Sequence, residues 1–289
     1  MANLRAIRKR IASVKNTRQI TKAMKLVSGA KLKRATEAVI AARPYNRKLK
    51  GILDNLLASM EELDHPLFQV REKVERVKIV VFGSDRGLCG SFNSTINRRL
   101  DALIRNDFAG KEVELITVGR KSRDHARRQG YKVVQEYSNL APASFATVAR
   151  EVVVGLVKDF EEGHVDLAVL LYNQFRSAIS QEVTTENLVP LTPPVKKDDA
   201  AQTALTDFIY EPSQAAILDA LLPQLVTARA LQAFLESTAS EHGSRMSAMD
   251  NATRNASEMI EKLTLEYNRA RQAAITKELV EIVSGAEAL

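Results

Sequence analysis

One segment of this chain, residues 225–283, is long and regular enough to constrain the rest of the fold. It contains no proline and a single glycine, Gly243. Its apolar and small residues recur at alternating spacings of three and four, the pattern of a left-handed coiled coil. These residues are Met246, Met249, Thr253, Ala256, Ile260, Leu263, Tyr267, Ala270 and Ala274. A helix over the segment would be roughly 90 Å long, so it needs a partner helix along one face.

The composition of the chain excludes several classes of protein. Charged residues are spread along the 225–283 segment, and no other window is apolar enough for a membrane span. The first 25 residues are rich in Lys and Arg and do not resemble a signal peptide. A single cysteine, Cys89, excludes an internal disulfide framework and fits a reducing compartment. Aromatic residues are only 5% of the chain, as long exposed helices would produce.

The N-terminal segment is strongly basic. Residues 1–50 contain fifteen Lys and Arg residues and one acid, Glu37. Such a block indicates an anionic partner, and nucleic acid, membrane headgroups and an acidic protein surface are all candidates. The segment lacks interleaved aromatics and any nucleic-acid motif. Its charges surround the predicted helix, which favours an enclosing acidic protein surface.

Residues 3–42 are predicted to form one helix with a heptad-like apolar row. The row begins with Leu4, Ile7, Ile11 and Val14 and continues through Thr17, Ile20 or Thr21, Met24, Val27 or Ser28, Lys31 or Leu32, Ala35, Val39 and Ala42. Pro44 is expected to bend or interrupt the helix, which resumes over residues 51–60. The middle of the row is small and polar, so it allows close packing against another helix.

The central part of the chain alternates between predicted strands and helices. Strands are expected over residues 77–82, 112–118, 131–137, 166–172 and 179–188, the last at a sheet edge. Helices are expected from Ser91 or Asn93 to about 106, and over residues 121–129 and 144–162. Residues 190–202 are predicted to be an exposed loop, and Ser213 to cap the last helix. The alternation implies a mostly parallel sheet covered by helices.

The predicted fold class is α/β, with a long antiparallel coiled coil of the N- and C-terminal helices and an inserted Rossmann-like α/β domain. The expected divisions are an N-terminal coiled-coil helix (1–65), an α/β globular domain (74–205) and a C-terminal coiled-coil helix (206–289). Pairing of the two helices within one chain is favoured over pairing between two chains by effective concentration.

No catalytic, cofactor or metal site is predicted. Gly83, Gly87 and Gly90 follow a strand and precede a helix, which suits phosphate binding, but their spacing matches neither G-x-G-x-x-G nor a Walker loop. A structural turn is the favoured interpretation, and nucleotide binding is the alternative. The four histidines lack ligand spacing, and Cys89 has no evident base nearby.

Three stretches closely resemble the γ subunit of F-type ATP synthases, in its bacterial form. They are IASVKNTRQITKAM at 11–24, SDRGLCG at 84–90 and YNRARQAAITKEL at 267–279. The resemblance covers the whole chain in order. One departure is Ala274, where a serine often stands. The resemblance implies a non-enzymatic central-stalk rotor that couples proton flow to ATP synthesis and hydrolysis and regulates ATPase activity.

The same resemblance implies partners and contact residues. The partners are the α and β subunits of a hexamer, the ε subunit and the c-subunit ring, with no nucleic acid and no cofactor. The chain would be peripheral, on the cytoplasmic face of the bacterial inner membrane, which it meets only through the ring. The implied contacts with β are Arg8, Lys9, Lys15, Arg18, Lys22, Met24, Arg271, Gln272, Thr276 and Glu278. The implied apical tip is Ile275, Leu279, Ile282 and Val283, and the implied ring contacts are Phe208, Tyr210 and Glu211.

Overall fold

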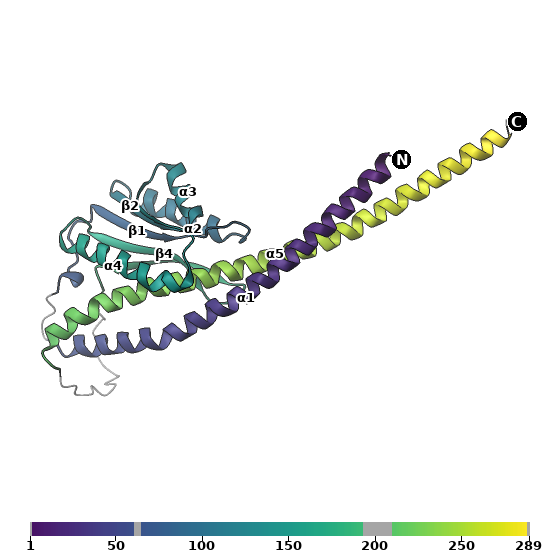
Figure 1. Cartoon of the computed structure of the whole chain (residues 1–289). Coiled ribbons are helices and arrows are strands. Elements are labelled where there is room, and N and C mark those ends of the chain that lie inside the picture. The colour runs from purple at the N-terminus through teal and green to yellow at the C-terminus, as the bar shows by residue number, and fades with distance from the viewer. Residues whose placement is uncertain (1, 61–64, 193–209, 288–289) are drawn as a thin grey trace, which may run out of the picture. The chain divides into compact units, whose positions relative to one another are not determined.

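The computed structural model describes residues 2–60, 65–192 and 210–287 (Figure 1). The chain divides into two compact units. We call Met1–Ala30 together with Arg245–Leu289 the coil unit, and Lys31–Ser244 the body unit. Helices α1 (Ala2–Ala58) and α5 (Gln214–Glu287) each contribute residues to both units. The three domains expected from the sequence, with bounds at residues 65, 74 and 206, do not correspond to these two units. Those domain bounds therefore remain a prediction.

Helix α1 runs without a break through Pro44, so the interruption predicted there is wrong. The buried residues Val39, Leu49, Leu53 and Leu56 continue the heptad spacing across the proline. Pro44 itself lies on the exposed side of the helix. A proline inside a helix costs about 3 kcal/mol through the lost hydrogen bond and the ring clash, and the burial of leucines after it offsets that cost.

The body unit contains a five-stranded sheet in the order β3-β2-β1-β4-β5. Strands β1 (Arg76–Phe82), β2 (Glu112–Val118), β3 (Lys132–Tyr137) and β4 (Leu167–Phe175) pair in parallel. Strand β5 (Gln181–Val189) pairs antiparallel with β4 and forms one edge. The predicted mostly parallel sheet with a final edge strand is confirmed.

Helices cover both faces of this sheet. Helix α2 (Phe92–Ala102), which continues as a π-helical turn over Leu103–Asp107, and helix α3 (Arg120–Gln129) lie on one face (Figure 1). Helix α4 (Phe145–Glu161) and the body part of α5 lie on the other. Short 3-10 turns occupy Pro66–Phe68 and Pro142–Ser144. The arrangement is a three-layer α/β sandwich.

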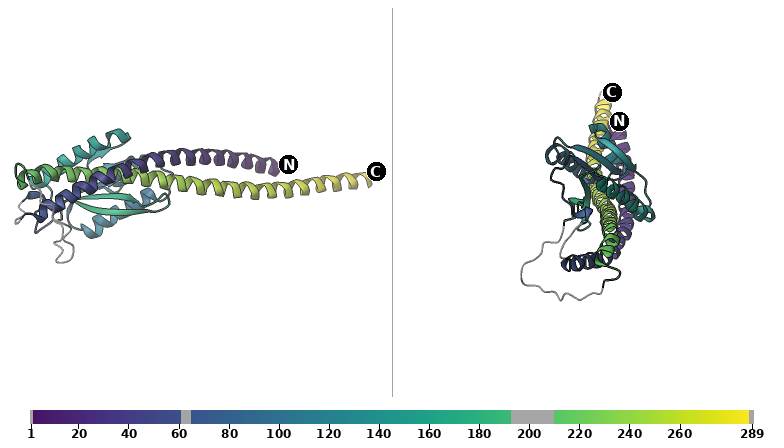
Figure 2. Two further views of the ribbon diagram at one scale, coloured as in Figure 1. Left: turned by 90° about the horizontal axis from the view of Figure 1, so that it is seen from below. Right: turned by 90° about the vertical axis from the view of Figure 1, so that its left-hand side faces the viewer.

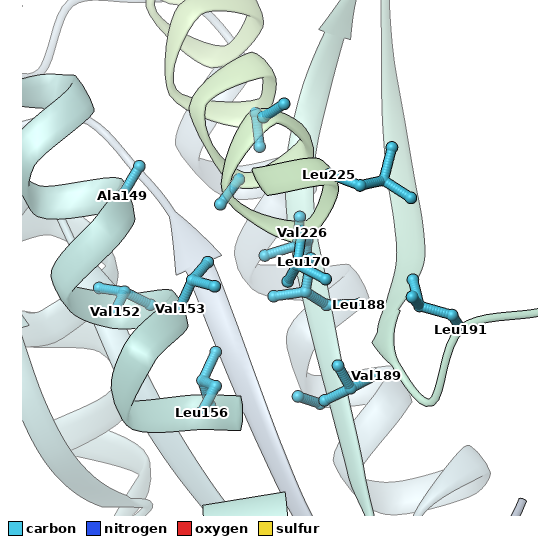
Figure 3. Packing of buried hydrophobic residues seen from close by; sticks show 14 of the residues in the cluster. Ala149, Val152, Val153, Leu156, Leu170, Leu188, Val189, Leu191, Leu225 and Val226 are labelled. Carbon is cyan, nitrogen blue, oxygen red and sulfur yellow. The ribbon is translucent and has the colours of Figure 1, made fainter. Parts of the chain in front are cut away.

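The larger core lies between the sheet, α4 and α5. Residues from four elements meet there (Figure 3): Ala149, Val152, Val153 and Leu156 from α4, Leu170 from β4, Leu188 and Val189 from β5, and Leu225 and Val226 from α5. Successive residues of β1 alternate between the two cores, because side chains of a strand point to opposite faces. Val80 and Phe82 join the larger core, whereas Ile79 and Val81 join the smaller one beneath α2 and α3.

Within the body unit, α1 and α5 run in opposite directions. The Asn46 side-chain amide donates to Gln232 Oε1 at 2.9 Å, and the Gln214 amide donates to Ser59 Oγ at 3.2 Å. Ser213 caps the start of α5 as predicted, since its Oγ accepts from the backbone N–H of Ala216 at 3.3 Å.

Candidate functional site on the paired end helices

In the coil unit, the first part of α1 lies beside the last part of α5 (Figure 2). The Lys25 ammonium donates to the Asp250 carboxylate at 2.6 Å. Further along, the Arg8 guanidinium donates to the Tyr267 hydroxyl at 2.7 Å and lies over its ring, 5.6 Å from the centroid. Residue numbers rise in one helix as they fall in the other, so the pairing is antiparallel. One chain supplies both helices, as the sequence favoured.

The middle of the coil is small and polar. The Thr253 hydroxyl donates to Thr21 Oγ1 at 2.8 Å across the two helices. Ser28 is buried, and a β-carbon added to Gly29 would meet Met246 Sδ at 3.4 Å. Such residues let the two helix backbones approach closely. A polar pair inside a coiled coil also favours one register over its alternatives.

The structure resolves the positions where the sequence left two candidates. Thr21, Ser28 and Leu32 are buried. Ile20 and Val27, the more apolar alternatives, are 60% and 57% exposed. Spacing relative to the other heptad positions, more than hydrophobicity, determines which residue faces the partner helix.

One position of the apolar row predicted for residues 3–42 is wrong. Thr17 is exposed, and the neighbouring Arg18 is half-buried in its place. Arg18 and Lys25 follow Ile11 at intervals of seven, so they occupy the heptad position that Leu32 fills later. The residue type misled the assignment, because long cationic side chains can bury their stems along a helix while the charged ends reach water.

The implied basic contact residues on α1 are accessible. Arg8, Lys9, Lys15 and Lys22 are exposed. Residues 1–30 hold eight Lys and Arg residues and no acid. Within the described residues, Lys25 alone among those eight forms an ion pair. Arg8 also contacts Tyr267 through its guanidinium. The charges of Lys9, Lys15 and Lys22 are therefore the most readily available to an external anionic surface.

The ion pair at Lys25 also affects its partner. The hydrogen bond from Lys25 holds the pKa of Asp250 below its ordinary value, with further support from Arg254. Arg254 Nη2 lies 3.7 Å from Asp250 Oδ2. This ion pair was not predicted from the sequence. A signal was present, since Lys25 falls on the coil side of α1 and needs a counter-charge there. Met24, which precedes Lys25 and is one of the implied contacts with β, is half-buried.

The implied β contacts near the C-terminus, Arg271, Gln272, Thr276 and Glu278, are all exposed. Helix α1 begins six residues before Arg8, whereas α5 continues for twenty residues beyond Tyr267. Most of the α5 residues after Tyr267 therefore have no described residue of α1 beside them.

Apolar side chains on the last turns of α5 are exposed. Ile275, Leu279, Ile282 and Val283 are 44%, 57%, 68% and 54% exposed. Val280, which was not predicted, belongs to the same set and is 58% exposed. Its position next to Leu279 was the available signal. Ile275, Leu279, Ile282 and Val283 follow one another at spacings that place them on one side of the helix, so these exposed apolar side chains form a candidate contact surface.

A shallow groove of about 540 Å³ lies along α5 near Tyr267. Its lining residues are Lys262, Leu265, Glu266, Arg269, Ala270 and Ala273. Leu265 is 60% exposed. The groove was not predicted, because it depends on where small alanines and long charged side chains alternate on the helix surface.

The implied ring contacts are only partly described. Phe208 lies outside the described residues. Tyr210 is half-buried, and its hydroxyl lies 3.5 Å from Ser59 Oγ of α1. Glu211 is exposed. These two residues precede the first residue of α5, Gln214, by four and three positions.

The glycine loop at residues 83–90 is held by contacts within the body unit. Asp85 accepts from the backbone N–H groups of Arg120 at 3.1 Å and Asn139 at 2.8 Å. Asn93 does not cap α2, and its Oδ1 instead accepts from the Ser84 N–H at 3.0 Å. These side chains are engaged inside the fold, which favours the structural interpretation of the loop over nucleotide binding.

Across the described ranges, no three or more His, Cys, Asp or Glu side chains gather where they could hold a metal ion. Over the same residues, no helix has an apolar run long enough to cross a bilayer.

Comparison with known proteins agrees with the architecture. The family described as ATP synthase matches residues 3–289. The ATP synthase gamma chain of Geobacter metallireducens is 49% identical over 296 residues, which cover 100% of this chain and 99% of the relative. The gamma chain of Pelotomaculum thermopropionicum is 46% identical over 289 residues, covering 100% of both chains.

Solved structures share the fold. A chain of the Euglena gracilis mitochondrial ATP synthase described as OSCP/F1/c-ring matches with a TM-score of 0.70 and 20% identity, over 99% of this chain and 94% of that chain. A chain of the same enzyme's rotor matches with a TM-score of 0.66 and 21% identity, over 95% and 99%. The full-length match and the identities of the curated relatives establish that this chain belongs to the ATP synthase gamma chain family.

Proposed function

We propose that this chain is the non-catalytic rotor of an F-type ATP synthase. In this role it couples proton flow through a membrane ring to ATP synthesis and hydrolysis in a hexamer of α and β subunits, and it regulates ATPase activity. The chain makes and breaks no bonds itself. The end helices form the axle, and the α/β domain forms the foot that rests on the ring.

The antiparallel pairing of the two ends of the chain carries this proposal. A single helix bends and twists easily, whereas two helices wound together resist both motions. The contacts at Lys25–Asp250 and Thr21–Thr253 join the helices at fixed points. The Euglena chain that is described as part of the rotor shares this fold, which supports the same role.

The cationic side chains of α1 are suited to passing contacts with an acidic surface of β. Arg8, Lys9, Lys15, Arg18 and Lys22 have no ion pair within the described residues. Contacts between exposed charges are weak and screened by salt. A rotor needs such contacts, because a deep apolar contact with one β subunit would stop it there.

The upper end of the axle would make two further kinds of contact with the hexamer. Met24 would lie at the waist of the shaft, and the exposed Arg271, Gln272, Thr276 and Glu278 would meet a loop of β as they pass. The apolar tip would turn in a smooth collar of α and β, which explains why its side chains are exposed in the free chain.

The lower end would bind the ring and ε. Phe208, Tyr210 and Glu211 would contact the polar loops of the c subunits, and the ε subunit would bind beside the α/β domain. The chain would then be a peripheral protein on the cytoplasmic face of the bacterial inner membrane, attached only through the ring. We retain the division into 1–65, 74–205 and 206–289 on this basis.

Reconstitution tests the proposal. The α and β subunits are assembled with and without this chain, and ATP hydrolysis is measured over a range of ATP concentrations. A basic coiled coil of equal charge and unrelated sequence serves as the control. We expect this chain, and not the control, to produce fast and cooperative hydrolysis. Identical, uncooperative hydrolysis with and without the chain would refute a coupling role.

A further inference from the structure

Gly243 is the one glycine in residues 224–284 and lies inside the long helix α5. Glycine is among the least favourable residues in the interior of a helix, because it loses most conformational freedom there. Gly243 is buried. No other glycine or proline lies between Pro223 and Gly285. A glycine kept at this buried interior position of α5 indicates a specific contact that excludes a side chain.

The hairpin between β4 and β5 supplies that contact. A β-carbon added to Gly243 would lie 3.1 Å from the carbonyl oxygen of Ala178 and 3.4 Å from its Cα. The obstacle is backbone, which cannot rotate away as a flexible side chain can. The absence of a side chain at 243 therefore lets the hairpin backbone rest directly on α5.

Two serines on the same face of α5 fix two more segments of the body unit. The Ser240 hydroxyl donates to the Asn173 carbonyl of β4 at 2.9 Å. The Ser244 hydroxyl donates to the Cys89 carbonyl, in the 83–90 loop, at 2.8 Å. Both serines are buried. We call Ser240, Gly243 and Ser244 the seat.

The seat differs from the apolar contacts that also join α5 to the sheet. Apolar packing is non-directional and tolerates small rotations of a helix about its axis. Hydrogen bonds to fixed carbonyls are directional and weaken steeply when misaligned. Three backbone segments that meet one turn of α5 therefore define a single rotational setting of the helix against the sheet.

We propose that the seat is the coupling through which the α/β domain turns the axle. This inference rests on the proposed rotor function, in which torque enters the α/β domain from the ring. Ser240, Gly243 and Ser244 are positioning residues in that process. They hold α5 so that it turns with the α/β domain and does not slip within it.

The test uses the assembled complex in sealed vesicles, with ATP hydrolysis and ATP-driven proton uptake measured together. In Gly243→Leu, the leucine side chain displaces the hairpin from α5. The matched control is Gly155→Leu, at an exposed helical glycine of α4 with no atom within 4 Å of an added β-carbon. We expect Gly243→Leu to hydrolyse ATP yet lose most of its proton uptake per ATP, and Gly155→Leu to match the wild type.

If Gly243→Leu does not assemble into the complex, a second variant still tests the inference. Ser240→Ala with Ser244→Ala keeps the seat small and removes both hydrogen bonds, so it should assemble and show a partial loss of proton uptake per ATP. Full coupling in every assembled seat variant, beside a coupled wild type, would overturn this inference alone. A wild-type complex that does not couple at all would overturn the proposed function instead.

Discussion

Neutralising the exposed lysines of α1 should weaken binding to the hexamer without unfolding the chain. The variant carries Lys9→Gln, Lys15→Gln and Lys22→Gln, three exposed residues without an ion pair in the described structure. Each contact between exposed charges contributes about 0.2–1 kcal/mol. Loss of three should cost about 0.6–3 kcal/mol, or about a 3- to 150-fold increase in Kd. The free energy of unfolding should change by less than about 0.5 kcal/mol.

The assay titrates labelled chain with the α and β hexamer at several salt concentrations. A matched control carries Arg98→Gln, Lys121→Gln and Arg128→Gln on α2 and α3, which removes the same charge from three other exposed, unpaired residues of the described chain. The α1 variant should bind more weakly at low salt and converge with the wild type at high salt. Equal weakening by both variants would show that net charge, and not the α1 surface, attracts the hexamer.

Four further predictions concern the body unit and are measured by urea unfolding. Gly51→Ala, at an exposed helical glycine with open space around it, should raise the free energy of unfolding by about 0.5–1 kcal/mol. Gly243→Ala should give no such gain, and an equal gain would contradict the close contact at that position. Gly119→Ala should cost about 3 kcal/mol, because φ is +93° and the new β-carbon would lie 2.3 Å from the Gly83 carbonyl; an unchanged midpoint would refute this. Burial raises the pKa of Asp166, but hydrogen bonds from two backbone N–H groups and an arginine outweigh it and hold the pKa below its ordinary value. Its stabilisation is present above the unfolded pKa of about 3.9 and is lost as pH falls through the lower folded value. Asp166→Asn should therefore cost about 1.5–3 kcal/mol at pH 7, and the difference from wild type should shrink below about pH 4. A difference independent of pH would contradict this assignment.

The fold was largely predictable from sequence, because its periodic patterns are strong. The row from Met249 to Tyr267 identified the side of α5 that faces α1, and the β-branched strands identified the sheet. The predicted interruption at Pro44 was wrong, because the heptad pattern continues on both sides of the proline. Local rules describe what one residue favours, whereas packing along the whole helix determines whether it tolerates a proline.

The candidate site was predictable to a lesser extent. Exposure of the cationic and apical residues follows from the amphipathic pattern of each helix. The contacts at Ser244 and Gly243 could not be predicted, because their partners are backbone carbonyls more than 60 positions away in the sequence. A serine or glycine carries no sequence signal for which carbonyl it will meet.

Rotation of a probe on the body unit tests the central claim most directly. The hexamer is fixed to a surface, and a bead is attached through a cysteine at Ile179, which is 84% exposed, in a Cys89→Ala background. With ATP, the bead should turn continuously in one direction, and its rate should rise with ATP concentration. A stationary or randomly moving bead, in complexes that hydrolyse ATP at the full rate, would contradict the proposal that the paired end helices act as an axle.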